Sequence, residues 1–184
     1  MAQLSIITAP DPRLKIKAQP VPAVDANVRR LMDDMLETMY QAIGIGLAAP
    51  QVGQGSRVIV LDVAREGEKP QPLKLANPEI LWRSPELATF SEGCLSLPEH
   101  YADVTRPAEV RLRYLDEENE IREMHAKGLL ATCVQHRAGK DKPVGRDHRG
   151  IGAELGKRRG RLRCPQADRT AQGKPVLRSQ QLHW

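Results

Sequence analysis

The sequence lacks the features that would place it in a membrane or an oxidising compartment. No apolar run approaches the ~20 residues that cross a bilayer, and the start, residues 1–7, has no basic region followed by an apolar core. Only three cysteines occur, Cys94, Cys133 and Cys164, and they show no close pairing. They do not form a disulfide framework and suit a reducing compartment. We therefore expect an unexported, cytoplasmic protein.

Aromatic residues are also scarce, at 3% of the chain, and after residue 136 the only one is Trp184. Residues 137–184 carry 13 Lys and Arg against 4 Asp and Glu, a net charge of +9, whereas residues 1–136 sum to −4. With 13 hydrophobic residues among 48, the second part buries too little apolar area to offset chain entropy. These contrasts predict one folded domain over residues 1–136 and a basic, mostly disordered tail over residues 137–184.

The tail contains the cationic run Lys157-Arg158-Arg159-Gly160-Arg161-Leu162-Arg163, which offers contacts to phosphate groups. It has no interleaved aromatic residues on which bases could stack. Contact with RNA or the ribosome is one hypothesis for this run, and a simply solvated charged segment is the other.

Hydrophobic periodicity predicts two helices and a sheet. Apolar residues at three- and four-residue spacing predict an amphipathic helix that begins near Asp25 or Asn27, runs to Ile43 and is closed by Gly44. We expect residues 6–14 to be extended, because each proline biases the preceding residue away from helix. Apolar or alternating runs predict strands over residues 58–61, 73–82, 87–91, 110–114 and 121–125, joined by polar loops that favour hairpins. A second helix is predicted over residues 129–136.

Two segments carry residues with chemical potential. Residues 92–99 present Cys94 in a turn between glycine and proline, flanked by carboxylates. A thiolate there is a nucleophile or soft metal ligand if it is partly exposed beside a cation or metal, and otherwise a small buried thiol. Residues 44–53 are small except for Gln51, which could donate to a carbonyl oxygen beside closely approaching backbone. The alternative for this segment is a helix C-cap followed by a tight connection.

Residues 44–53, 92–99 and 128–136 occur in an order and at spacings that resemble peptide deformylase. The resemblance covers about the first three quarters of the chain. It implies an α+β fold with mixed, mainly antiparallel sheets around a central helix that bears metal ligands. It also implies a hydrolase that removes the formyl group from the N-terminal formyl-methionine of new polypeptides. The implied cofactor is a divalent metal, Fe²⁺ first, with Zn²⁺ or Ni²⁺ as alternatives.

The family pattern carries over to five positions. By resemblance, Cys94 and His136 are metal ligands, and Gln51 and the backbone N–H of Leu95 bind the substrate carbonyl oxygen. Gly46 falls where the family's backbone meets substrate. These residue types suit the chemistry, because a metal generates hydroxide and donors aimed at the developing oxyanion stabilise the tetrahedral intermediate. Arg106 lies in a further family-like segment and is expected to be structural.

The pattern then fails, because Arg137 stands where the family has the general base Glu and Lys140 stands where it has a second His. Either biological divergence or a shifted reading frame explains this together with the change in charge. We expect Arg137 to point away from the face that bears His136. Three hypotheses remain: a deformylase with impaired turnover, an inactive peptide-binding relative, and a nucleic-acid binder. The other histidines are not convincing ligands; they are His100, His125, His148 and His183.

Overall fold

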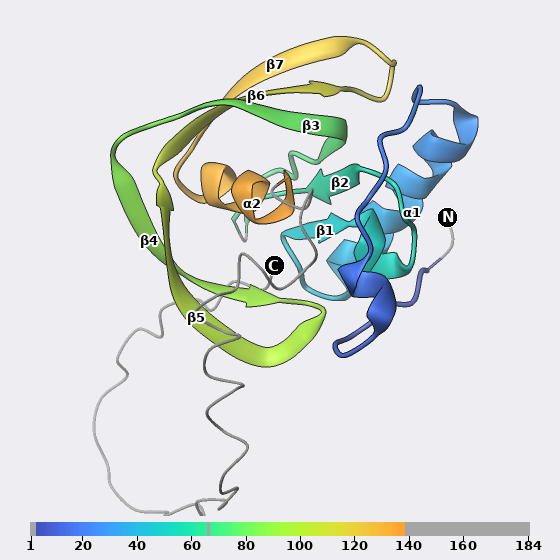
Figure 1. The fold of residues 1–184 in the computed structure, drawn as a ribbon, viewed down its shortest axis with the longest axis horizontal. Helices are drawn as coiled ribbons and strands as arrows, with labels where there is room; N and C mark the ends of the chain where they lie inside the picture. Colours follow the sequence, from blue (N-terminus) through green and yellow to red (C-terminus); the bar gives the residue numbers. More distant parts are fainter. Residues whose placement is uncertain (1–2, 66, 139–184) are drawn as a thin grey trace, which may run out of the picture.

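The computed structural model describes residues 3–65 and 67–138. Two α-helices, two short 3₁₀ helices and seven strands follow one another along this part of the chain (Figure 1). In chain order they are η1 (Pro12–Lys15), α1 (Ala26–Gln41), β1 (Gly46–Ala48), η2 (Ala49–Val52), β2 (Val58–Leu61), β3 (Leu73–Arg83), β4 (Leu87–Cys94), β5 (Leu97–Pro107), β6 (Glu109–Leu115), β7 (Ile121–Lys127) and α2 (Gly128–Ala138).

The described strands form two antiparallel sheets. One has the order β1-β2-β3-β6-β7. The other is a two-stranded ribbon of β4 and β5, which lie between β3 and β6 in chain order, whereas β3 and β6 themselves pair with each other. Helix α2 contacts strands of both sheets and lies between them in Figure 1, while α1 packs on β1 and β2. This arrangement confirms the expected α+β class with a central second helix. Neither α1 nor α2 has the length and apolar character needed to cross a membrane, within the described residues.

Strand β2 separates the two halves of the core. Its four residues are all buried, and successive side chains of a strand point to opposite faces. Val58 and Val60 therefore pack into the cluster that contains the α1 methionines, whereas Ile59 and Leu61 pack into the cluster that contains Cys133 and Val134 of α2. Met32, Met35 and Met39 of α1 are fully buried, so they belong to the apolar face of the amphipathic helix predicted there.

Helix α1 begins as predicted, but it ends earlier. The Asp25 side chain accepts hydrogen bonds from the backbone N–H groups of Asn27 and Val28 at 2.9 Å each. At the other end, the predicted limit at Ile43 is wrong, because Ile43 has a left-handed φ of 54° and lies outside the helix. The Gly44 N–H donates to the Met39 carbonyl at 2.9 Å and the Ile43 N–H to Tyr40 at 3.0 Å, which is a Schellman ending.

Other boundaries also differ from the predictions. Residues 12–15 form η1 rather than an extended piece, because Asp11 accepts the Arg13 N–H at 2.8 Å and caps the turn. Strand β5, which pairs with β4, was not predicted. Its prolines at positions 98 and 107 argue against a strand when the sequence is considered alone, because proline cannot donate a backbone hydrogen bond. The short strand β1 was missed for a similar reason, since its three residues are small. Helix α2 continues through Ala138, two residues past the predicted domain boundary.

Candidate active site

Three elements bring the candidate residues into one buried cluster. Gln51, in η2, donates from Nε2 to the Sγ atom of Cys94, at the end of β4, over 3.7 Å. Glu92, two residues earlier on β4, accepts a hydrogen bond from His136 of α2, while the neighbouring Arg137 contacts Gln51. These links join η2, β4 and α2 in a closed ring. All five side chains are less than 7% exposed, and Cys94 is 4% exposed rather than partly open.

The Glu92 carboxylate is the structural centre of the ring. Arg106, on β5, donates Nε to Oε1 at 2.6 Å and Nη2 to Oε2 at 2.9 Å, and His136 Nδ1 lies 2.7 Å from Oε2. A carboxylate only accepts, so His136 donates from Nδ1, and the neutral ring in this tautomer would carry its lone pair on Nε2. Arg106 is structural, as expected. Glu92 is engaged through both oxygens and serves to orient His136.

Gln51 has a fixed orientation. Its Oε1 accepts the Ala48 backbone N–H at 3.0 Å, and its Nε2 donates to Ser96 Oγ at 3.2 Å as well as to the Cys94 sulfur. The amide N–H group therefore faces the β4–β5 turn, where Leu95 follows Cys94.

Arg137 does not point away from the site, so that expectation was wrong. Its side chain is 1% exposed; Nη1 donates to Gln51 Oε1, and Nη2 donates to the Gly46 carbonyl oxygen at 2.8 Å. Its Nε is buried without a hydrogen-bond partner among the described residues. The sequence placed Arg137 one position along a helix from His136, which is about 100° around the axis. Because sheet and ribbon both contact α2, that direction also leads into the protein.

Close packing surrounds the Arg137 guanidinium. A Cβ atom at Gly46 would lie 2.8 Å from Cys133 Sγ and 3.4 Å from Arg137 Nε, so only glycine fits there without a shift. The Cys133 thiol donates to the Ile45 carbonyl over 3.6 Å. Burial raises the pKa of Cys133 to about 12, although the nearby Arg137 charge opposes that shift. Cys133 is therefore a neutral thiol in the core cluster to which α2 contributes.

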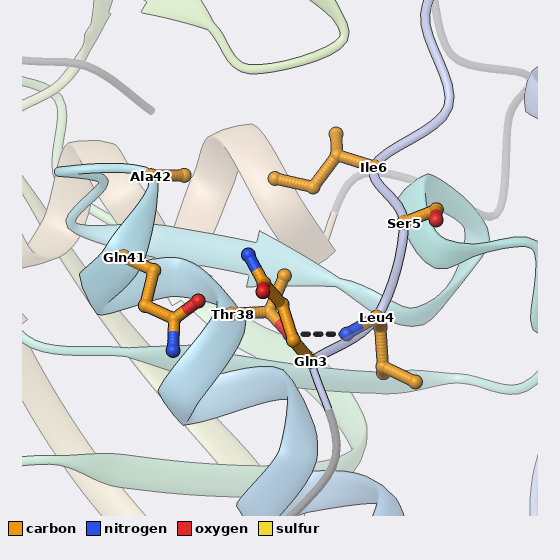
Figure 2. Close-up of a pocket in the computed structure, with 7 residues that line it drawn as sticks. All are labelled: Gln3, Leu4, Ser5, Ile6, Thr38, Gln41 and Ala42. Carbon is orange, nitrogen blue, oxygen red and sulfur yellow. Dashed lines mark hydrogen bonds between the residues drawn. The ribbon is translucent and has the colours of Figure 1, made fainter.

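The remaining candidates lie away from this cluster. His100 is exposed and contacts the Pro98 carbonyl, and His125 is paired with Glu109 on the sheet surface, as expected. His148, His183 and all of the predicted basic tail from residue 139 onward lie outside the described residues. A pocket of about 570 Å³ lies between residues 3–6 and the end of α1, near Thr38, Gln41 and Ala42, and includes none of the candidate residues (Figure 2).

Comparison with known proteins identifies the class to which this α+β fold and site belong. The family profile for polypeptide deformylase matches residues 3–140. Peptide deformylase of Methylocella silvestris is 59% identical over 134 residues, covering 71% of this chain and 68% of that protein; the Phenylobacterium zucineum enzyme is 57% identical over 136 residues, covering 74% and 80%. The Legionella pneumophila peptide deformylase structure is similar with a TM-score of 0.75, 36% identity, and coverage of 85% of this chain and 92% of that one.

A structure of the Ehrlichia chaffeensis peptide deformylase in complex with actinonin gives a TM-score of 0.74 at 35% identity, covering 88% of this chain and 100% of that one. The chain therefore belongs to the polypeptide deformylase family, whose members are metal-dependent hydrolases that remove the N-formyl group from newly made polypeptides.

The side chains of this site do not fit a complete metal centre. Catalytic zinc-type sites generally use three protein ligands and one open position. Among residues 3–65 and 67–138, no three His, Cys, Asp or Glu side chains lie together in a way that could hold an ion. Cys94 and His136 supply two ligand types, and the next side chain along α2 is a buried cation.

Proposed function

We propose that this chain is a deformylase of formyl-methionyl polypeptides whose turnover is strongly impaired. In this proposal Cys94 and His136 are the two remaining metal ligands, and Fe²⁺ is the ion of the intact site. Gln51 and the backbone N–H of Leu95 bind the formyl oxygen, and Gly46 lines the substrate backbone. The orientation of the Gln51 amide toward Cys94 and the Glu92 contact that fixes His136 both support these roles.

The contact of Arg137 with Gln51 and Gly46 carries the proposal of impaired turnover. A guanidinium cannot accept a proton from water or deliver one to the leaving amine at neutral pH, because it stays protonated. General acid–base help of that kind contributes about 10²–10⁴-fold to a rate. Arg137 also donates to the Gly46 carbonyl oxygen, and this proposal assigns Gly46 to substrate binding, so a peptide would have to compete with Arg137 there.

The decisive experiment compares this chain with a version in which Glu-x-x-His follows His136. Deformylation of a formyl-methionyl peptide and the amount of bound metal per chain are measured on both. We expect the restored version to gain metal and turnover together. A third version with Gln-x-x-His after His136 is the matched control, because it restores the ligand without the base. It should gain metal but remain about 10²–10⁴-fold slower than the Glu version.

Two outcomes would contradict the proposal. An unmodified chain that turns over at the rate of the restored version would show that Arg137 does not impair the site. A restored version that holds one metal and binds formyl peptide without hydrolysing it would favour the inactive peptide-binding relative instead.

The cytoplasmic location and a contact of the basic tail with RNA or the ribosome remain parts of the proposal that rest on composition alone. The tail prediction is tested by deleting residues 141–184 and measuring RNA retention at low and high salt, since phosphate contacts weaken steeply as salt rises.

A further inference from the structure

We propose that Arg137 is a resident cation that excludes divalent metal from the Cys94–His136 site, beyond the loss caused by the missing ligand. This inference rests on the proposed function for the identity of the ligands. It goes further, because it assigns an active inhibitory role to the residue that replaced the base.

The first observation is that the Arg137 charge is buried without a counter-charge. The side chain is 1% exposed, and among the described residues both of its hydrogen-bond acceptors are neutral oxygens and no ion pair to it is found. The carboxylate of this ring belongs to Glu92 of β4, and both of its oxygens are bound to Arg106 and His136. The positive charge of Arg137 is therefore not neutralised by a described neighbour.

The second observation is the position of this charge. A single carboxamide, that of Gln51, separates the guanidinium from the Cys94 sulfur: Oε1 faces Arg137, and Nε2 faces Cys94 at 3.7 Å. A divalent ion on the Cys94 sulfur would consequently lie within the same buried volume as a full positive charge. Two like charges separated by one amide group repel strongly in the protein interior, because the interior screens charge far less than water does.

A loss of ligands and a repulsion predict different results for one substitution. Arg137→Met removes the charge, keeps a side chain of similar length and leaves the ligand set at Cys94 and His136. If only the missing ligand limits metal binding, the affinity stays as it is. If the charge repels the ion, we expect Arg137→Met to bind Co²⁺ on the order of 10²-fold more tightly than the unmodified chain.

The experiment titrates Co²⁺ into the full chain and follows both the heat of binding and the thiolate-to-cobalt absorption band. Three further variants accompany Arg137→Met. Arg137→Lys retains a charge without the planar fork and should bind as weakly as the unmodified chain. Arg137→Gln is a second neutral variant, should the methionine variant not fold. Cys94→Ala in the Arg137→Met background should abolish the absorption band, which assigns the gain to this site.

Equal Co²⁺ affinity of the unmodified chain and both neutral variants would overturn the inference, as would a gain in Arg137→Lys as large as in Arg137→Met. Neither readout uses turnover. A metal gain in Arg137→Met would stand even if the version with restored Glu-x-x-His did not deformylate, and in that case only the proposed function would fail.

Discussion

The buried Glu92 carboxylate should be among the most costly polar groups to replace in this protein. It is fully buried, while Arg106 and His136, its partners, are 12% and 1% exposed at their side chains. Three charge-assisted or ionic hydrogen bonds of 2.6, 2.9 and 2.7 Å converge on its two oxygens. Any substitution that removes the negative charge leaves the Arg106 guanidinium without its counter-charge in the protein interior.

Glu92→Gln is the most informative change because it keeps the shape of the side chain. If the amide NH₂ takes the place of Oε1, it faces Arg106 Nε; if it takes the place of Oε2, it faces Arg106 Nη2. One donor therefore opposes another in either orientation. Breaking a buried pair by removing one partner typically costs about 3–5 kcal/mol, a large share of the roughly 5–15 kcal/mol by which domains are stable.

Urea unfolding followed by circular dichroism measures this cost. With a slope of about 2 kcal/mol per molar urea, a loss of 3–5 kcal/mol lowers the midpoint by roughly 1.5–2.5 M. Glu109→Gln is the matched control, since Glu109 pairs with His125 and Lys127 at the surface, where it is 33% exposed. Exposed pairs contribute about 0–1 kcal/mol. Equal midpoint shifts for the two variants would refute the reasoning from burial.

Three further predictions concern α2, β1 and α1. Burial raises the pKa of Cys133 to about 12 from an ordinary 9.0, so the thiol ionises in the unfolded chain before it does in the folded one. The free energy of unfolding should therefore fall as pH rises between those values, by up to about 1.4 kcal/mol per pH unit. Urea titrations of Cys133→Ala should lack this pH dependence, and the same pH dependence in both proteins would contradict the prediction. Gly46→Ala should cost about 1–3 kcal/mol by overpacking against Cys133, and the double variant Gly46→Ala/Cys133→Ala should cost less than the sum of the two single variants; strict additivity of unfolding energies would disprove the contact. Asp25→Ala should lower stability by about 1 kcal/mol through loss of the α1 cap, whereas Asp25→Asn keeps a capping oxygen and should lose little; equal thermal midpoints for these two variants would argue against the cap.

The sequence predicted those elements that periodicity and caps determine locally. Strand β2 has the predicted bounds because four consecutive apolar residues fit a strand buried on both faces, and Asp25 marked the start of α1 because its side chain caps the helix. Strand β5 escaped prediction because its stability comes from pairing with β4 and not from an apolar pattern of its own. The left-handed Ile43 was missed because the following glycine is the usual residue for that position.

For the candidate site as well, local motifs predicted which residues take part, and the surroundings of the helix could be learned only from the structure. Family resemblance named Gln51, Cys94 and His136 from motifs, and the structure brings all three into one ring of contacts. The direction of Arg137 could not be read from helical spacing, because spacing gives an angle around the axis and not what surrounds the helix. Only the positions of β1 and η2 show that this angle leads to Gln51 and Gly46.

The α2 residues that pack into the core precede the α2 residues at which this chain departs from the family pattern. The core clusters take Ala131, Cys133 and Val134 from this helix, and Gln135 anchors it by donating to the Pro107 carbonyl at 2.8 Å. These contacts all precede His136, so the departure from the family pattern begins after the helix has been fixed against both sheets. Arg137, which follows, sets the charge beside the candidate ligands and is itself buried against Gln51 and Gly46. A family fold can therefore persist around a site whose chemistry has changed.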